Sequence, residues 1–227
     1  MRLVLLFVLV WLCTPSFAKE STCYGTTRHG RIEDAVKLPD SAPNFVSYGN
    51  IPELAGRTYV HSKVRDVVIS AYKLLEKEQP GKVFKYAETG TRQGGKFWPH
   101  KTHQNGLSVD LMVPVLDEQE NSVHLPTNPL NEYGYAIEFD DEGRYEDYRI
   151  DFEALGALIV ALHRSASSHG IGLWRVLFVP NLQPYLYKST YGDYIRANIT
   201  IPTKRSWRPH DEHIHVDFVV KCLPLKG

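Results

Sequence analysis

Residues that could bind a metal gather in two short stretches of this chain. Five of its ten histidines fall within residues 100–103 and 210–215, which is tighter than scattered surface or core histidines would be. The first stretch, GGKFWPHKTHQNGLSVDLMVPV (94–115), contains an H-x6-D pair, and the second, WRPHDEHIHVDFVV (207–220), contains an H-x-H pair. Imidazole and carboxylate groups are common zinc ligands, so the two stretches together predict a metal site.

Both stretches alternate apolar and polar residues, as half-buried strands do. In HIHVDFVV, His215 shares one face with His213 and Asp217, while the residues between them point to the other face. SVDLMV alternates in the same way and places Asp110 on the face opposite its valines. If the two strands are neighbours, Asp110 and His215 converge on one side of a sheet.

The third ligand is expected from the loop before the first strand. His103 lies in that loop, and Gly106 allows the chain to turn back into the strand. His103, Asp110 and His215 would supply two imidazoles and one carboxylate, with a fourth position left for water. That is the ligand number of a catalytic zinc site rather than a closed structural one. We therefore expect one catalytic Zn²⁺.

The segments GGKFWPHKTHQNGLSVD and HDEHIHVDF resemble those of the zinc peptidases that include lysostaphin, D-alanyl-D-alanine peptidases and the hedgehog signalling domain. They are most similar to penicillin-insensitive murein endopeptidases. Weaker similarity extends from CYGT (23–26) through DFEAL (151–155). The resemblance implies a metallo-endopeptidase, a murein hydrolase, that cuts peptide cross-links between the stem peptides of bacterial peptidoglycan.

The resemblance also implies roles for the remaining histidines. His213 would be the catalytic histidine, acting as a base or a transition-state donor, with a fourth metal ligand as its alternative. His210 would be a further catalytic histidine that donates a hydrogen bond to the substrate or the oxyanion. His100 could be an outer group or an extra ligand, and the sequence does not decide between them. Carboxylates that could orient ligand imidazoles are Asp211, Glu212 and Asp217.

Two other functions use similar residues. A non-haem iron oxygenase also binds its metal with two histidines and one carboxylate, but such enzymes typically begin their triad with H-x-D. A non-catalytic, metal-containing wall-binding module is the second alternative, since the hedgehog relative has a similar site. The presence of His210 and His213 favours an enzyme over such a module.

Residues 1–18 are typical of a secretory signal peptide. Arg2 precedes an apolar run at 3–12, and Ser16-Phe17-Ala18 provides a small-x-small cleavage site. The run is too short for a comfortable membrane span, so we expect no stable span after cleavage. The mature protein, 19–227, would then be periplasmic or otherwise exported.

Cys23 and Cys222 are the cysteines that remain after cleavage. Because export leads to an oxidising compartment, a disulfide joining the two ends is the simplest interpretation. Two free buried thiols are the alternative.

Charge and length limit the remaining possibilities. The chain has 26 basic and 26 acidic side chains, and loss of the leader with Arg2 would leave a net charge of −1. No basic excess is present to neutralise phosphates, which argues against nucleic acid as a partner. The length suits a single domain with a real core, and the sequence does not indicate an oligomeric state.

The periodicities predict an α+β domain, with a mostly antiparallel sheet, flanking helices and long loops, and the zinc site on the sheet. Helical spacing runs from residue 61 to 79 and from 151 to 170. Residues 24–58 and 116–134 are expected to be irregular, and 181–206 could include a short helix. Further strands are expected at 83–87, 136–139, 171–179, where the run is the most β-like and reads as buried, and 213–220.

Overall fold

The computed structural model describes residues 19–204 and 209–225, so the predicted signal peptide, 1–18, lies outside the described residues. The main element is a six-stranded sheet in the order β13-β14-β8-β7-β5-β4, antiparallel except where β5 pairs with β7. Its strands are β13 (Gly172–Leu177), β14 (His213–Val219), β8 (Ser108–Met112), β7 (Phe84–Tyr86), β5 (Phe45–Ser47) and β4 (Ser41–Ala42). The predicted α+β class with a mostly antiparallel sheet is confirmed.

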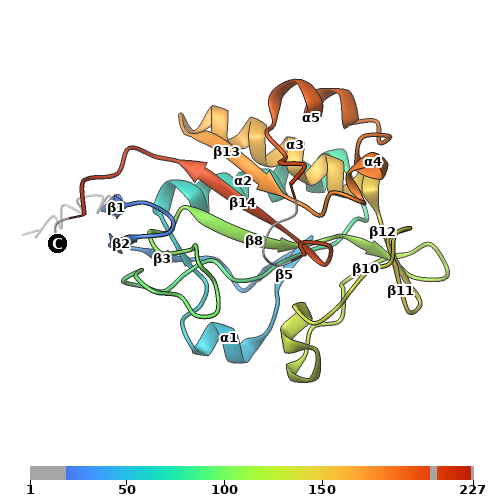
Figure 1. Cartoon of the computed structure of the whole chain (residues 1–227), viewed down its shortest axis with the longest axis horizontal. Coiled ribbons are helices and arrows are strands. Elements are labelled where there is room, and N and C mark those ends of the chain that lie inside the picture. Colours follow the sequence, from blue (N-terminus) through green and yellow to red (C-terminus); the bar gives the residue numbers. More distant parts are fainter. Residues whose placement is uncertain (1–18, 205–208, 226–227) are drawn as a thin grey trace, which may run out of the picture.

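Two long helices, α2 (Ser62–Glu78) and α3 (Phe152–Ser168), pack side by side and lie on the same side of this sheet (Figure 1). Both begin at residues that accept a hydrogen bond from the first turn. His61 Nδ1 accepts from the amide of Lys63, and the Asp151 carboxylate accepts from that of Ala154. The two predicted helices are confirmed.

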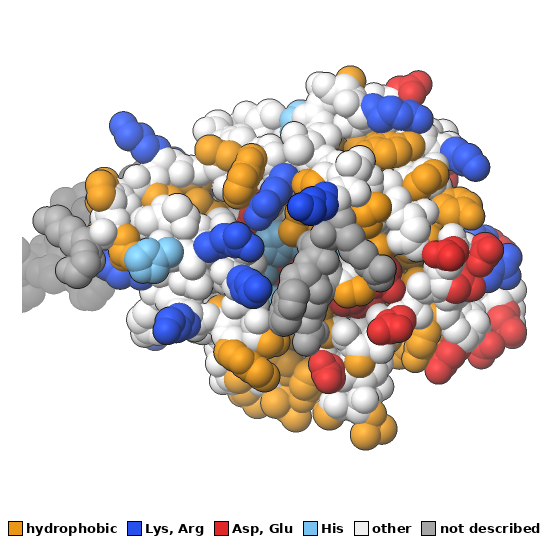
Figure 2. Space-filling view, in the orientation of Figure 1, with side chains coloured by type: hydrophobic (Ala, Val, Ile, Leu, Met, Phe, Trp, Pro, Cys, Tyr) orange, Lys and Arg blue, Asp and Glu red, His pale blue; other side chains and the backbone are white. Residues whose placement is uncertain are grey.

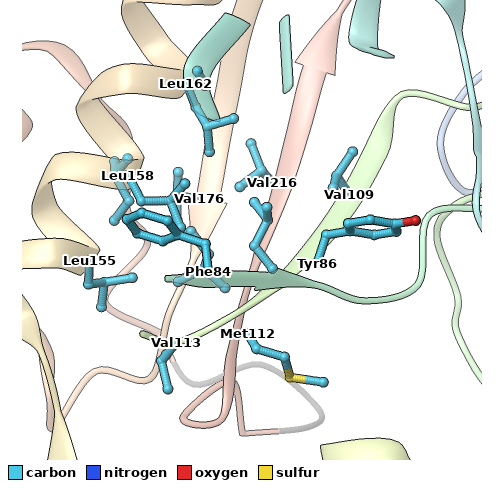
Figure 3. Close-up of a cluster of buried hydrophobic side chains, with 14 of the residues drawn as sticks. Phe84, Tyr86, Val109, Met112, Val113, Leu155, Leu158, Leu162, Val176 and Val216 are labelled. Atoms are coloured by element: carbon cyan, nitrogen blue, oxygen red, sulfur yellow. The ribbon is translucent and has the colours of Figure 1, made fainter. Parts of the chain in front are cut away.

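Apolar side chains fill the space between the helices and the sheet. In Figure 3, Leu155 and Leu158 of α3 point toward Val176 of β13 and Val216 of β14, and all four are at most 1% exposed. Val216 lies on the same face of its strand as Ile214 and Phe218. The histidines of β14 therefore face away from the helices, on the open side of the sheet.

Segments that were expected to be irregular contain short paired strands, too short for a periodic pattern to reveal. Residues 24–58 contain β2 to β5 and part of β1, and β4 pairs with β5 within this range. Residues 116–134 contain β10, which pairs with β9 in a small antiparallel sheet of order β10-β9-β12-β11. The additional strands are β1 (Thr22–Gly25), β2 (Gly30–Glu33), β3 (Val36–Lys37), β6 (Tyr59–Val60), β9 (Val115–Leu116), β10 (Ser122–Val123), β11 (Arg144–Tyr145) and β12 (Tyr148–Ile150). The short helices are α1 (Asn50–Leu54), η1 (Pro129–Gly134), α4 (Gln183–Leu186) and α5 (Gly192–Asn198).

Two strand predictions were wrong in part. Residues 136–139 form no strand; the amide of Phe139 instead donates to the carboxylate of Asp211 at 2.6 Å. The run 171–179 contains a strand, β13 (Gly172–Leu177), but not a buried one, because among the described strands β13 pairs with β14 alone and lies at the edge of the sheet. Trp174 on this strand is 51% exposed.

A disulfide joins Cys23 to Cys222 across a sequence separation of 199 residues, as predicted. Backbone hydrogen bonds beside it link the same segments, from Leu223 N to Cys23 O and from Gly25 N to Leu223 O, each 2.9 Å long. The two ends of the described chain are therefore tied together. Within the described ranges, no helix has the length and apolar character needed to cross a lipid bilayer.

Candidate metal centre

The pairing of β8 with β14 brings the two sequence motifs together. The strands are antiparallel neighbours, and their register places Asp110 directly opposite His215. Both side chains project from the face that is not covered by helices, as the alternation predicted. Asp110 is fully buried and His215 is 3% exposed. The pair forms the floor of the candidate site.

His103 reaches this floor from the loop that precedes β8. Its backbone has a φ of 66°, in the left-handed region that a residue with a side chain rarely adopts. Gly106, with a φ of 75°, turns the loop into the strand, and a Cβ there would come within 2.8 Å of the amide nitrogen of His61. His103 is fully buried, so the loop holds its imidazole in one place at the cost of backbone strain.

The nitrogens of His103 are arranged as in a metal ligand. Its Nδ1 lies 3.1 Å from the carbonyl oxygen of Thr89 and can donate to it. Its Nε2 is buried without a hydrogen-bond partner and lies 3.2 Å from Asp110 Oδ1. A buried polar atom rarely stays unpaired, and a lone pair aimed at a carboxylate is satisfied once a cation lies between the two.

His215 is held in the same manner. Its Nδ1 lies 2.7 Å from Asp110 Oδ1, and its Nε2 lies 2.9 Å from Asp217 Oδ1. Asp217 is fixed in turn by the hydroxyl of Ser108 at 2.6 Å and by the guanidinium of Arg175. Histidines that bind a metal through one nitrogen usually donate the other N–H to a carboxylate or carbonyl. His103 Nε2 and His215 Nδ1 both converge on Asp110 Oδ1, so the donor set fits a divalent ion.

The second carboxylate oxygen of Asp110 faces a different group of side chains. The hydroxyl of Tyr135 donates to Oδ2 at 2.9 Å. His100 Nδ1 and His213 Nε2 each lie 3.8 Å from the same oxygen. Each of these histidines is held from behind by a carboxylate, at 2.5 Å from His100 Nε2 to Glu88 and at 2.8 Å from His213 Nδ1 to Glu212.

His100 belongs to a group of side chains that could hold a metal ion. The ligand atoms of His100, His103 and Asp110 all lie within 4.8 Å of one another, and this buried group could hold a metal ion. His100 is thus close enough to be an extra ligand, and its contact with Glu88 also suits an outer group, so both roles that the sequence left open are compatible with its position.

Charged groups around the centre shift several pKa values. Burial lowers the pKa of His103, which favours its neutral form. Burial opposes a charge on His215 as well, but the carboxylates of Asp217 and Asp110 outweigh it and raise its pKa to about 10. Asp110 is buried too, yet the surrounding histidines hold its pKa well below the usual value. Burial opposes a charge on His213 too, but the carboxylates of Glu212 and Asp110 outweigh it and raise its pKa. Without a metal, the surrounding carboxylates therefore favour protonation of both His215 and His213.

Glu88 links the centre to a half-buried arginine, Arg57. Arg57 makes two hydrogen bonds to its carboxylate, and Tyr48 adds a third at 3.0 Å. Burial raises the pKa of Glu88, but the hydrogen bonds of His100 and Arg57 outweigh this and lower it to about 2. Glu88 is therefore ionised and able to hold the Nε2 proton of His100.

A cleft of about 300 Å³ opens above these groups. His210 lies on its wall with its ring centroid 4.8 Å from that of His213, and His213 and His215 line its floor. In Figure 2, histidine is visible at the centre of this face, with lysines and arginines around it. The described residues that line the cleft are Arg28, Pro99, His100, Lys101, Thr102, Tyr135, Arg175, Leu177, Pro202, Lys204, His210, His213 and His215.

All six residues singled out in the two motifs lie at this centre, but three neighbours were missed. Tyr135, Glu88 and Arg57 contact the motif residues from segments with no metal-binding pattern of their own. Glu88 follows a predicted strand, where an acidic residue is ordinarily a solvated charge, and its burial is visible only in the fold. Neither protein-family models nor curated proteins give a match to this chain.

Proposed function

We propose that this protein is an exported, zinc-dependent endopeptidase that hydrolyses peptide cross-links of bacterial peptidoglycan. The observation that carries the proposal is the division of Asp110. Its Oδ1 faces His103 Nε2 and His215 Nδ1, and its Oδ2 faces Tyr135 and His213. One side of the carboxylate is arranged for a metal, and the other side is arranged for proton transfer at the floor of the cleft.

The donor set supports zinc. Two imidazole nitrogens and one carboxylate oxygen are a common ligand set of catalytic zinc, which leaves a position for water. The outward nitrogens of both ligands are already engaged, by Thr89 and by Asp217, so each imidazole has its tautomer fixed for binding. Zinc bound there would polarise a water molecule and lower its pKa to about 7.

His213 is placed to move protons. Glu212 lies 2.8 Å from its Nδ1 and holds the ring so that Nε2 points toward Asp110. His213 Nε2 can accept a proton from the attacking water and return it to the departing amine, as a general base and then a general acid. Glu212 stabilises the imidazolium formed between these two steps.

Donors for the developing oxyanion are also close. Tyr135 carries its hydroxyl at the metal centre, and burial raises its pKa well above the usual value, so this group stays protonated at neutral pH. His210 lies against His213 on the cleft wall. Fixed donors aimed at a developing negative charge lower the barrier of acyl transfer. The cleft therefore offers a proton-transfer group, His213, and hydrogen-bond donors for an oxyanion, Tyr135 and His210, around the amide of a bound substrate.

Support for peptidoglycan as the substrate comes from the motif resemblance and from export. The disulfide between Cys23 and Cys222 is compatible with an oxidising compartment.

Digestion of purified murein by the mature protein, 19–227, tests the proposal. We expect soluble muropeptides with new amino termini, identified by mass spectrometry, and loss of this release after chelation. Two other outcomes would each replace the proposal. Binding to murein without cleavage would indicate a wall-binding module, and iron with 2-oxoglutarate turnover would indicate an oxygenase.

A further inference from the structure

We infer that the cleft recognises a free carboxylate on the substrate peptide, close to the bond that is cut, and that Arg28 and Lys204 bind it. This inference rests on the proposed function and names a chemical feature of its substrate. It starts from the charges that line the cleft.

Cationic side chains reach the cleft from separate segments. Arg28 lies in the turn between β1 and β2, Lys101 in the loop that carries His103, Arg175 on β13, and Lys204 beyond α5. None of the described lining residues is an aspartate or glutamate. The acidic side chains below, such as Asp110, are buried and already paired, so the mouth of the cleft is positive.

This concentration of charge is not a property of the whole chain. The protein has equal numbers of acidic and basic side chains, and its acids collect elsewhere. Figure 2 shows lysines and arginines around the central histidine and a group of aspartates and glutamates at the right of the same face. Like charges that converge on one cleft repel one another and attract an anion. The segregation therefore favours an anionic ligand at the centre.

Arg28 and Lys204 are the members that stay available to a ligand. Both are exposed, and neither forms an ion pair within the described ranges. Arg175 differs because Asp217 holds its guanidinium, at 2.7 Å from Nη2, so this residue belongs to the support of His215. A guanidinium can bind a carboxylate through two parallel hydrogen bonds, and a nearby ammonium adds attraction without fixed geometry.

A peptide supplies the complementary group as a carboxylate, either at its carboxyl end or on a side chain. Bound at the mouth of the cleft, this anion would place the adjacent amide over His213 and His210. The scissile amide itself is neutral. The cations therefore select substrate peptides that carry a carboxylate next to the amide, and they do not distinguish one amide bond from another.

The experiment compares two substrates that differ only in this group. Purified murein is used untreated or after its free carboxylates are converted to carboxamides with carbodiimide and ammonia. Because a hydrogen bond to a charged group contributes about tenfold or more in affinity, we expect the amidated murein to be cut at least about tenfold more slowly. Initial rates of muropeptide release provide the comparison.

Variants assign the effect to the two residues. Arg28→Gln and Lys204→Gln should each slow cleavage of untreated murein by about tenfold and change cleavage of amidated murein less than about twofold. Lys73→Gln removes an exposed cation from α2, outside the cleft, and should affect neither substrate. Because Arg28 and Lys204 are exposed, the thermal midpoint of each variant should match that of the wild type.

Cosedimentation with insoluble murein separates this inference from the proposed function. If the protein cleaves neither substrate, the proposed function is wrong, and binding still decides the inference, since the wild type should bind untreated murein about tenfold more tightly than amidated murein. The carboxylate site would be overturned if the wild type bound both substrates equally, or if the wild type and Arg28→Gln each cleaved both substrates at equal rates. Neither result would contradict the proposed peptidase function.

Discussion

His215 faces Asp110 across two antiparallel strands, with Nδ1 2.7 Å from Oδ1. Its other nitrogen faces a second carboxylate, that of Asp217. This position between two acids raises the pKa of His215 to about 10, whereas burial lowers that of His103. A metal ion must therefore displace a proton from His215 before it can bind there.

Zinc binding should accordingly release about one proton per chain at pH 7, because ligands must be deprotonated to bind. Zinc affinity should fall as the pH is lowered. Titration calorimetry in buffers of different ionisation enthalpy measures the number of protons released. Binding without proton release would show that His215 is neutral in the metal-free protein, contrary to its place between two carboxylates.

Tyr135→Phe tests the contact with the second oxygen of Asp110. The hydroxyl donates to Oδ2 at 2.9 Å, and Tyr135 lines the cleft. Loss of one such donor should slow cleavage by about a hundredfold if it also serves the oxyanion, with near-stoichiometric zinc retained. A fall in zinc content with normal turnover per bound zinc would limit Tyr135 to holding Asp110.

Glu88 should stabilise the fold above the pH at which its carboxyl is protonated in the unfolded chain. Its pKa falls from the ordinary value of 4.5 to about 2 on folding, so this stabilisation is complete above about pH 5 and is lost as the pH falls toward 2. The shift corresponds to about 3 kcal/mol. Glu88→Gln should remove that amount at neutral pH and almost none near pH 2.

Urea unfolding of chelator-treated wild type and variant from pH 3 to pH 7 provides the measurement. If the free energy of unfolding of the wild type exceeds that of the variant by the same amount at every pH, the pKa shift assigned to Glu88 is wrong.

The disulfide should contribute strongly to stability, since it closes a loop of 199 residues. In the chain-entropy account this is worth about 5 kcal/mol. Replacing both Cys23 and Cys222 by alanine should lower the free energy of unfolding by several kcal/mol and leave zinc content unchanged in the folded fraction. Non-reducing peptide mapping should recover the two cysteines in one linked peptide, and a double variant as stable as the wild type would refute the contribution.

The alternation of apolar and polar residues was sufficient to predict one half of the centre. Period-two spacing in both motifs placed Asp110 and His215 on the same face, and their register confirms it. Gly106 was predicted to turn the loop that delivers His103, and it has a positive φ. Local patterns carried this information because the ligands lie on regular strands or next to them.

The parts of the site and fold that the sequence did not predict depend on contacts between distant segments. Tyr135 reaches Asp110 across 25 residues, and Arg57 reaches Glu88 across 31, so no local spacing reveals either pair. β13 was read as buried because its run is apolar, but strand order rather than composition decides which strand lies at an edge. In 136–139, the amide of Phe139 donates to Asp211, a partner that no local pattern reveals.

The most direct measurement of the central claim pairs zinc content with muropeptide release for wild type, His213→Ala and His215→Ala. The wild type should bind about one zinc and release muropeptides. His215→Ala should lose both zinc and activity. His213→Ala should keep zinc and fold yet cleave at least about a hundredfold more slowly, as expected on removal of a general acid–base. Loss of zinc from His213→Ala, or no muropeptide release from the zinc-loaded wild type, would contradict the account.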